Sequence, residues 1–221
     1  MKVVLPPRGA LVVLVLGAAI VTAAGLTPRT LAAQTPASSW RSLFNGKDLT
    51  GFTTTGTATW KVEDGVISGG QFGDPSKRGA LVTVDEFQDF ELELDFLIDE
   101  HGKYNSGVQI RGKTYQINIG RPPAEEYIGI GVHRGEPREW QWLHKGDEKD
   151  TVRKKLEWNT LRILAKGAHF EITLNGVETT NVTDPDPDPA WLGRGPLSFQ
   201  TYGAEDHAGF VKFRNMRIRA L

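Results

Sequence analysis

The sequence predicts an all-β protein, an antiparallel sandwich or jelly roll of two sheets. Short segments in which apolar and polar residues alternate recur from about residue 60 to the C-terminus, and a period of two is typical of a strand with one buried face. The dipeptides Asp64-Gly65 and Asn175-Gly176 favour hairpin turns because both of their residues accept positive φ. No stretch of ten or more residues keeps a helical period. Many short strands at a spacing of about 8–12 residues indicate a sandwich or jelly roll.

The predicted strands follow the alternation along the chain, and one charged segment is excluded from them. The segment Asp147–Glu157 carries charges on every side and is expected to form an exposed loop or one helical turn. No internal repeat and no second domain boundary is found. The predicted strands are Trp60–Val62, Val66–Ser68, Gly79–Thr83, Phe90–Ile98, Asn105–Arg111, Tyr115–Ile119, Tyr127–Arg134, Glu139–Leu143, Thr160–Ala165, His169–Leu174, Leu197–Thr201 and Phe210–Arg219.

The composition is that of a globular protein. The chain has 221 residues, of which 39% are hydrophobic, and this is enough for one well-buried core. A net charge of -1 gives no electrostatic reason to expect nucleic acid or an anionic membrane as partner. The chain has no Cys, which excludes disulfides and thiolate metal sites.

The N-terminus has the features of a targeting segment. Lys2 and Arg8 precede an apolar run from about residue 10 to residue 24, shorter than the ~20 residues that span a bilayer. Small residues at Ala32 and Ala33 suit a signal-peptidase site. We therefore expect residues 1–33 to be a signal peptide and residues 34–221 to form a secreted or periplasmic domain. An uncleaved membrane anchor is the alternative.

The polar face of two neighbouring predicted strands, Asn105–Arg111 and Tyr115–Ile119, is unusual. It carries amides and a guanidinium in place of the usual mixture of Lys, Glu and Thr. Amides and Arg present donors and acceptors that suit a ligand made of hydroxyls and carbonyls. We interpret this face as the floor of a sugar site; a solvated sheet face with cross-strand hydrogen bonds is the alternative. The residues concerned are Asn105, Gln109, Arg111, Gln116 and Asn118.

An imidazole and several aromatic side chains are further candidates. In the segment from 127 to 134, Tyr127 and His133 share the face opposite the apolar residues. An imidazole can act as a base near neutral pH, although a lone His is more often structural. Trp140 and Trp142 lie two residues apart and share a face, so they either stack on a pyranose ring or pack in the core.

Seven segments, in order from about residue 40 to the C-terminus, closely resemble the 3-keto-disaccharide hydrolase domain family. The resemblance implies a concanavalin A-like jelly roll in which one sheet has a concave outer surface. It also implies activity on sugars whose carbon 3 carries a ketone, and hence a functional link to a sugar 3-oxidoreductase. The segments are S-L-F-N-G-K-D-L-T-G-F (Ser42–Phe52), W-K-V-E-D-G-V-I (Trp60–Ile67), D-F-E-L-E-L-D-F (Asp89–Phe96), N-S-G-V-Q-I-R-G (from Asn105), W-N-T-L-R-I (Trp158–Ile163), L-N-G-V (Leu174–Val177) and F-V-K-F-R-N-M-R-I-R (Phe210–Arg219).

The chemistry implied by this resemblance assigns roles to the candidates. A base removes the hydrogen next to the ketone, the enolate expels the glycosidic oxygen, and water adds to the enone. Such a site needs a base, donors at the ketone oxygen and an acid or water at the leaving group. Arg111 is the candidate donor and His133 the candidate base. A divalent cation can polarise the ketone instead, although no metal-ligating motif is present.

The sequence departs from the family at positions that usually carry the base or a metal ligand. Members usually have a carboxylate on the strand Tyr115–Ile119 or just after it, and this chain has Gln116, Asn118 and Gly120 there. Near the C-terminus, members of the family often have the tripeptide Gln-Asp-His, where this chain has Gln200-Thr201-Tyr202. Only Gln200 is kept, and it is a further residue expected to contact the sugar. Either another group supplies the base, or the chain is a non-catalytic carbohydrate-binding module on the same fold. Glu91, Glu93 and Asp95 share one face of a strand and could replace the missing carboxylates; the alternative is that this face is a solvated convex surface. Asp147 and Glu148, in the long loop, are further candidates.

Overall fold

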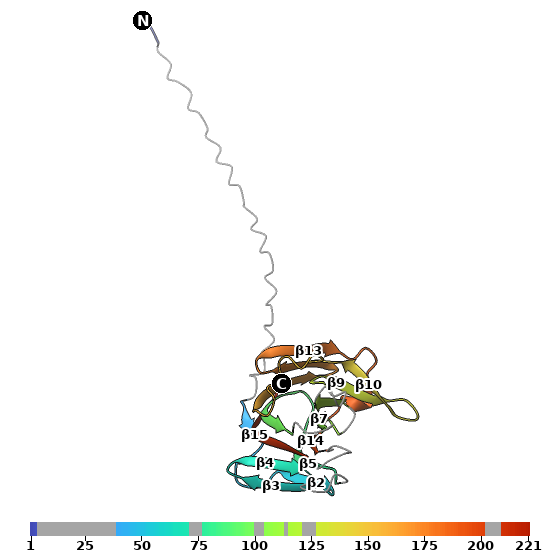
Figure 1. The fold of residues 1–221 in the computed structure, drawn as a ribbon. Helices are drawn as coiled ribbons and strands as arrows, with labels where there is room; N and C mark the ends of the chain where they lie inside the picture. Colours follow the sequence, from blue (N-terminus) through green and yellow to red (C-terminus); the bar gives the residue numbers. More distant parts are fainter. Residues whose placement is uncertain (4–38, 71–76, 100–103, 113–114, 121–126, 202–208) are drawn as a thin grey trace. The chain divides into compact units, whose positions relative to one another are not determined.

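The computed structural model describes residues 1–3, 39–70, 77–99, 104–112, 115–120, 127–201 and 209–221 (Figure 1). The chain divides into two units, Met1–Thr35 and Pro36–Leu221. Apart from its first three residues, the predicted signal peptide lies outside the described ranges, so it stays a prediction. Among the described residues, no helix has the length and apolar character needed to cross a membrane.

The described residues from 39 to 221 form two antiparallel sheets. The first has the order β13-β12-β11-β6-β15-β4-β3, with β1 also paired to β15, and the second has the order β10-β9-β8-β7-β14-β5-β2 (Figure 1). The strands of the first sheet are β1 (Arg41–Ser42), β3 (Thr59–Glu63), β4 (Val66–Gly70), β6 (Phe90–Ile98), β11 (Asn159–Lys166), β12 (His169–Leu174), β13 (Val177–Thr183) and β15 (Phe210–Ala220). Those of the second are β2 (Phe52–Gly56), β5 (Gly79–Phe87), β7 (Ser106–Ile110), β8 (Tyr115–Ile119), β9 (Ile130–Arg134), β10 (Glu139–His144) and β14 (Gly195–Thr201).

The predicted all-β sandwich is confirmed, and the strands that were not predicted lie at sheet edges. Asp64-Gly65 connects β3 to β4 and Asn175-Gly176 connects β12 to β13, with positive φ at all four residues. The edge strands β2 (F-T-T-T-G) and β13 (V-E-T-T-N-V-T) are Thr-rich and mostly exposed. An edge strand with little buried surface needs no apolar alternation, and the pattern therefore could not reveal it.

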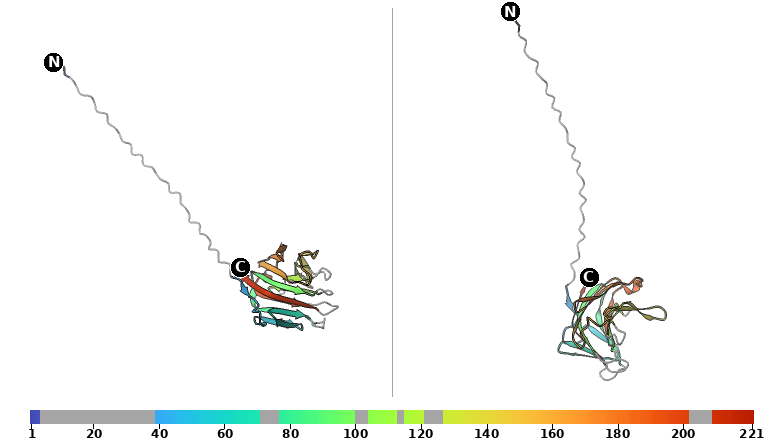
Figure 2. Two further views of the ribbon diagram at one scale, coloured as in Figure 1. Left: turned by 60° about the vertical axis from the view of Figure 1, so that its left-hand side comes forward. Right: turned by 45° about the horizontal axis from the view of Figure 1, so that its top comes forward.

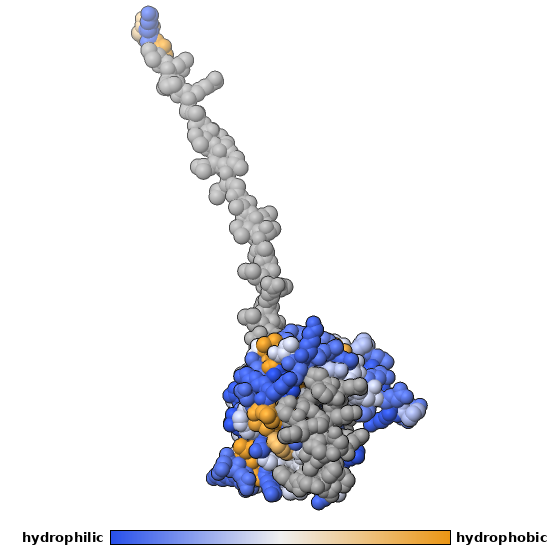
Figure 3. All heavy atoms as spheres, viewed as in Figure 1, coloured by the Kyte–Doolittle hydropathy of each residue, from blue (hydrophilic) through white to orange (hydrophobic). Residues whose placement is uncertain are grey.

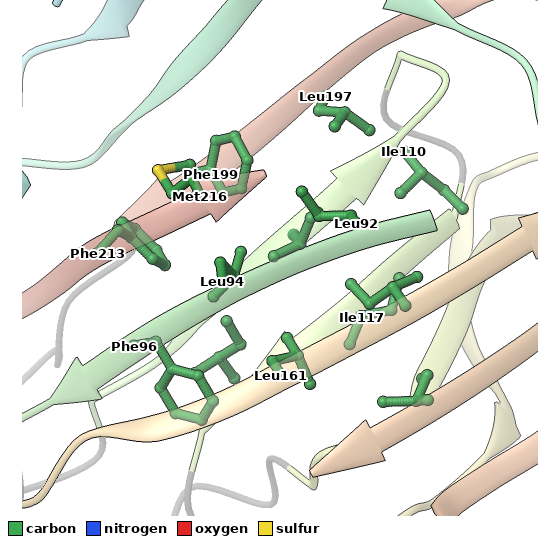
Figure 4. Close-up of a cluster of buried hydrophobic side chains, with 14 of the residues drawn as sticks. Leu92, Leu94, Phe96, Ile110, Ile117, Leu161, Leu197, Phe199, Phe213 and Met216 are labelled. Carbon is green, nitrogen blue, oxygen red and sulfur yellow. The ribbon is translucent and has the colours of Figure 1, made fainter. Parts of the chain in front are cut away.

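The hydrophobic core lies between the sheets and follows from the alternation of each strand. In β6, the side chains of Phe90, Leu92, Leu94 and Phe96 are fully buried. Figure 4 shows side chains of β6 beside Ile110, Ile117 and Phe199 of the other sheet and Phe213 of β15. Hydrophilic residues cover most of the described surface that is visible in Figure 3. The core therefore accounts for one face of every central strand and leaves the outer faces for other roles.

The outer face of the first sheet is occupied by ion pairs, and we call it the ion-paired face. Strands β6 and β15 run side by side (Figure 2), which brings the carboxylates of β6 against arginines of β15. Glu91 is nearly inaccessible and accepts hydrogen bonds from Arg162 and Arg219. The other carboxylates are held in the same way, Glu93 by Arg217 and Asp95 by Arg214, Thr160 and Asn215. All three carboxylates are therefore bound by side chains of their own sheet.

Candidate functional site

The predicted polar face exists as the outer face of the second sheet, and we call its central part the amide face. Alternation directs Val108 and Ile110 into the core, so Gln109 points outward. Register places Gln109 opposite Gln116 of β8. The residues that share this face are Gln109, Gln116, Asn118 and Gln200, since Gly107 lies opposite both Asn118 and Gln200.

Three of these amides form a chain of hydrogen bonds. The Nε2 of Gln109 donates to Oε1 of Gln116 at 2.9 Å, and Nε2 of Gln116 donates to Oδ1 of Asn118 at 2.7 Å. A Cβ at Gly107 would lie 2.8 Å from Nε2 of Gln116, so this glycine lets the Gln116 side chain lie flat on the sheet. Each primary amide has two N–H donors and two acceptor lone pairs. The chain of bonds orients these groups and leaves capacity at Gln109 and Gln116 for the hydroxyls and carbonyls of a ligand.

Trp140 and Trp142 lie beside the amides and not in the core. Both side chains are partly exposed on β10, and their ring centroids are 5.3 Å apart. A Cβ at Gly131 would lie 2.2 Å from the Trp140 ring, so the indole covers Gly131, whose register partner on β8 is Gln116. The sequence interpretation left two roles open for these indoles, stacking on a sugar ring and packing in the core. Their partial exposure on this outer face argues against the core, and stacking stays a prediction.

Tyr127 and His133 extend the indole pair at opposite ends, and we call the four side chains the aromatic platform. The Tyr127 ring lies 5.6 Å from Trp142, and the Lys145 Nζ lies 4.9 Å from the Tyr127 ring centre. Strand β9 begins only at Ile130, so the prediction that Tyr127 lies within that strand is wrong. Its ring nevertheless reaches the predicted face.

His133 has the protonation behaviour that a base requires. Its side chain is half-buried on β9, and its ring centroid lies 5.1 Å from that of Trp140. Burial, and then the positive charge of Arg138, lower the pKa of His133 below its ordinary value of 6.5. The imidazole is therefore neutral at neutral pH and able to accept a proton.

Arg111 does not lie on the amide face, and its predicted placement there is wrong. β7 ends at Ile110, and Arg111 adopts φ 53°, which breaks the alternation. Its guanidinium donates to the carbonyl of Gln88 at 2.6 Å and of Gly167 at 2.7 Å, and it pairs with Asp89 at 3.2 Å. The side chain is 1% exposed. Arg111 therefore ties the β5–β6 and β11–β12 turns to the end of β7 and cannot donate to a ligand on the amide face.

The remaining predicted residues lie at the rim. Asn105 directly precedes β7 and is half-buried. Gln200 lies on β14, opposite Gly107 on one side and Ala80 on the other, and its Oε1 atom is buried without a hydrogen-bond partner. Together with Gln109, it lines a hollow of about 260 Å³ whose other lining residues include Thr55 and Arg78.

The sequence analysis did not predict Thr55 and Arg78 as residues of this face. Arg78 lies two residues before Ala80, so the alternation of β5 extended backward would place both on one face. Thr55 belongs to the unpredicted edge strand β2, opposite Ala80. Strand alternation could therefore have placed Arg78 on this face, but no sequence pattern could have placed Thr55 there.

The amide face offers amide oxygens, but no carboxylate, as possible ligands for a cation. Ca²⁺ and Mg²⁺ are held by carboxylates together with carbonyl oxygens and water, and the amide oxygens of Gln116 and Asn118 accept hydrogen bonds from neighbouring amides. In the part of the chain that the structure describes, no group of three or more His, Cys, Asp or Glu side chains is placed to hold a metal ion. Asp147, a possible loop carboxylate, instead accepts backbone N–H bonds from Thr151, Val152 and Arg153.

The two antiparallel sheets form a β-sandwich, and one of them has an outer face of amides and partly exposed indoles, a combination that suits contact with sugars. The sequence from residue 39 to residue 219 matches the family described as the 3-keto-alpha-glucoside-1,2-lyase-like domain, and the chain belongs to this family. The resemblance read from the seven segments is thereby confirmed. No curated protein matches the chain.

Solved structures share the fold. A candidate glycosyl hydrolase from Parabacteroides distasonis is 26% identical with a TM-score of 0.56, covering 83% of this chain and 100% of its own. A second candidate glycosyl hydrolase from the same organism is 21% identical with a TM-score of 0.56, covering 82% and 94%. The carbohydrate-binding module CBM66 from Bacillus subtilis is 17% identical with a TM-score of 0.55, covering 77% and 96%. These likenesses agree with a jelly-roll sandwich.

Proposed function

We propose that the chain cleaves 3-keto-glycosides and that the sugar binds across the amide face and the aromatic platform. The family match supports the substrate class. The observation that carries the proposal is the position of the Trp140 indole over Gly131, next to Gln116 and its hydrogen-bonded partners. An apolar ring face beside oriented amides suits a pyranose, which has C–H groups on its faces and hydroxyls at its edge.

In the proposed reaction, the neutral imidazole of His133 removes the proton from carbon 2, next to the ketone at carbon 3. The electron pair forms an enolate, which expels the glycosidic oxygen from carbon 1 and leaves an enone. The leaving oxygen takes up a proton, and water then adds across the carbon–carbon double bond, so that the net change is hydrolysis. General-base catalysis of this kind contributes typically 10²–10⁴-fold to the rate.

Donors for the developing negative charge at the ketone oxygen come from neutral amides in this proposal. Gln109 and Gln116 retain N–H groups beyond those used between them, and Gln200 lies on the neighbouring strand. Arg111 has no part in this step, because its guanidinium is bonded to backbone carbonyls and Asp89. Preorganised donors stabilise an oxyanion without the cost of reorienting at the moment of reaction.

The proposal extends to where the chain works and what supplies its substrate. The apolar run after Lys2 and Arg8 supports export by a signal peptide ending at residue 33, and hence a secreted or periplasmic enzyme. A 3-keto-glycoside arises by oxidation of the carbon 3 hydroxyl, so a sugar 3-oxidoreductase must act first. A divalent cation stays an untested cofactor, and no step above depends on one.

The test is release of a chromogenic aglycone from a 3-keto-glucoside, with and without EDTA. We expect kcat/KM to rise with pH below 6.5 and to level off above it, because the pKa of His133 is lowered. His133→Asn should remove this rise and reduce kcat/KM about 100-fold. Release by His133→Asn at the wild-type rate and with the same pH profile would show that the base is another group.

A non-catalytic carbohydrate-binding module is the second candidate. It is favoured by the absence of a carboxylate among the described residues assigned to the amide face and the aromatic platform, and the module from Bacillus subtilis has a similar fold. This candidate predicts that glycans bind, that binding weakens in Trp140→Ala, and that no aglycone is released from the 3-keto-glucoside by the wild-type chain.

A further inference from the structure

We propose that Lys145 binds an anionic group on the leaving group of the substrate, at the Tyr127 end of the aromatic platform. The leaving group is the part of the glycoside beyond the glycosidic oxygen, either an aromatic ring or a second sugar. The anionic group is a carboxylate or a tetrahedral anion such as a phosphate or a sulfate. This inference rests on the proposed function, since it names the class of glycoside that the same site takes.

The aromatic platform is long enough for more than one ring of a ligand. Going from His133 to Tyr127, successive ring centroids lie 5.1, 5.3 and 5.6 Å apart, and a pyranose is similar in size to one six-membered aromatic ring. In the proposed function, the keto sugar lies over Trp140, next to His133. Its leaving group then extends along Trp142 and Tyr127, the remaining rings of the platform.

Lys145 brings a positive charge to this end of the platform. Its Nζ lies 4.9 Å from the centre of the Tyr127 ring. Among the described residues, no carboxylate forms an ion pair with Lys145. A cation over an aromatic ring is attracted to the ring face, and an ammonium has three N–H donors. Donors therefore remain for the oxygens of an anion.

The backbone holds Lys145 in this position. A Cβ at Gly129 would lie 3.0 Å from the Cα of Lys145. In the same way, a Cβ at Gly146 would lie 2.6 Å from the carbonyl carbon of Ile128. The two glycines therefore let the chain around Lys145 pack closely against the chain that follows Tyr127. The Lys145 side chain is half-buried, so its ammonium lies beside the platform and is still accessible to a ligand.

The charge of Lys145 determines the class of leaving group. A neutral group would stack on Trp142 and Tyr127 but would leave the ammonium without an ion-pair partner, whereas an anionic group would supply one. An ammonium is a compact point charge on a flexible stem, so it accepts planar and tetrahedral anions alike. Lys145 should therefore discriminate between leaving groups by charge and not by shape.

The experiment compares the glucosides of three phenols that differ only in the para substituent, which is a carboxylate, a sulfonate or a neutral carboxamide. Calorimetry on the purified chain uses the unoxidised glucosides, so that binding is measured without turnover. Both charged glucosides should bind about fivefold more tightly than the carboxamide, a modest factor because solvent screens a partly exposed charge pair. The preference should shrink at high salt. A preference for only one of the two charged glucosides would identify the anion that this subsite takes.

Two variants test the assignment and one serves as control. Lys145→Gln should reduce the affinity for the charged glucosides to that for the carboxamide. Lys145→Arg keeps the charge and should keep the preference, which separates loss of charge from loss of structure. Lys149→Gln removes the charge of an exposed lysine in the loop that follows, and it should bind all three glucosides as the wild-type chain does.

The outcomes separate this inference from the proposed function. Equal binding of the three glucosides by the wild-type chain, or a preference that survives in Lys145→Gln, overturns the anionic subsite, and aglycone release from a 3-keto-glucoside would still support the proposed function. Failure to bind any of the three also overturns the subsite, because stacking on the platform does not require the ketone. A preference that Lys145→Gln abolishes, in a chain that releases no aglycone, supports the subsite within a binding module.

Discussion

The outer faces of the two sheets are both polar, but they differ in what their polar groups do. On the ion-paired face, Glu91, Glu93 and Asp95 are bonded to arginines of neighbouring strands. On the amide face, Gln109, Gln116 and Asn118 are bonded mainly to one another and lie next to partly exposed indoles. The first face pairs its carboxylates with arginines, whereas the second has amide donors and acceptors beyond those used in its own hydrogen bonds.

The difference shows that strand alternation alone does not identify a binding face. Residues with charges of opposite sign on adjacent strands pair with each other and give a stable, self-contained surface. Neutral amides form weaker bonds to one another than a carboxylate forms with a guanidinium, so a sugar hydroxyl can compete for them. Substitutions should therefore change stability on the first face and at Arg111, and ligand affinity on the second.

The largest effect is expected for Arg111→Ala, which should lower the free energy of unfolding by about 3 kcal/mol. The Arg111 side chain is almost inaccessible to solvent, and its removal leaves the carbonyls of Gln88 and Gly167 without their guanidinium donor. Asp89 also loses its ion pair, although it keeps the hydrogen bond from the Gly167 N–H. Urea denaturation measures the loss, with Arg194→Ala as an exposed control. A variant of wild-type stability that loses aglycone release would restore Arg111 to the site.

Glu91→Gln should lower the free energy of unfolding by about 2 kcal/mol at pH 7, because Arg162 and Arg219 lose a common carboxylate. Burial opposes ionisation of Glu91, but hydrogen bonds from both arginines outweigh it and lower the pKa of this carboxyl below 4.5. Its contribution to stability is therefore present above about pH 4.5 and is lost as pH falls through the lowered value.

The measurement is the urea midpoint of both proteins between pH 3 and pH 7. We expect the two curves to converge at the acid end, where the wild-type carboxyl is protonated. Parallel curves across the whole range would mean that the ionised form of Glu91 gives no net stabilisation.

Trp140→Ala should weaken glycan binding about tenfold while changing the free energy of unfolding by less than about 1 kcal/mol, because its indole is a partly exposed stacking surface. Calorimetry with a neutral disaccharide measures the affinity. Gln141→Ala, at the exposed residue between the two indoles, is the control and should bind normally. A large loss of stability with unchanged affinity would assign Trp140 to packing.

The smallest effect is expected for Gln116→Ala, which should weaken the same disaccharide about fivefold. The variant removes the central amide that accepts from Gln109 and donates to Asn118, a loss of about 1 kcal/mol. Gln109→Ala should weaken binding by a similar amount, and the double variant by less than the product of the two factors, because the residues are coupled. Independent effects would mean that the hydrogen bond between Gln109 and Gln116 does not orient either group for the ligand.

Much of the candidate site followed from local patterns. Gln109, Gln116 and Asn118 could be assigned to one face because side chains alternate along a strand and the two strands are joined by a short turn. The position of Arg111 could not be predicted in this way, since its positive φ depends on the turn that follows β7 and breaks the alternation. Arg78 and Thr55 required the pairing of β5 with β2 and β14, which brings together residues far apart in the chain.

The sequence by itself determined the fold class, most of the strands and the family, because hydrophobic periodicity and short motifs are local properties of the chain. Only the tertiary structure decided which polar face carries ion pairs and which carries hydrogen-bonded amides, and that Trp140 covers Gly131 beside Gln116. These outcomes depend on which strands are neighbours and in what register, and a strand's own residues do not encode its partner.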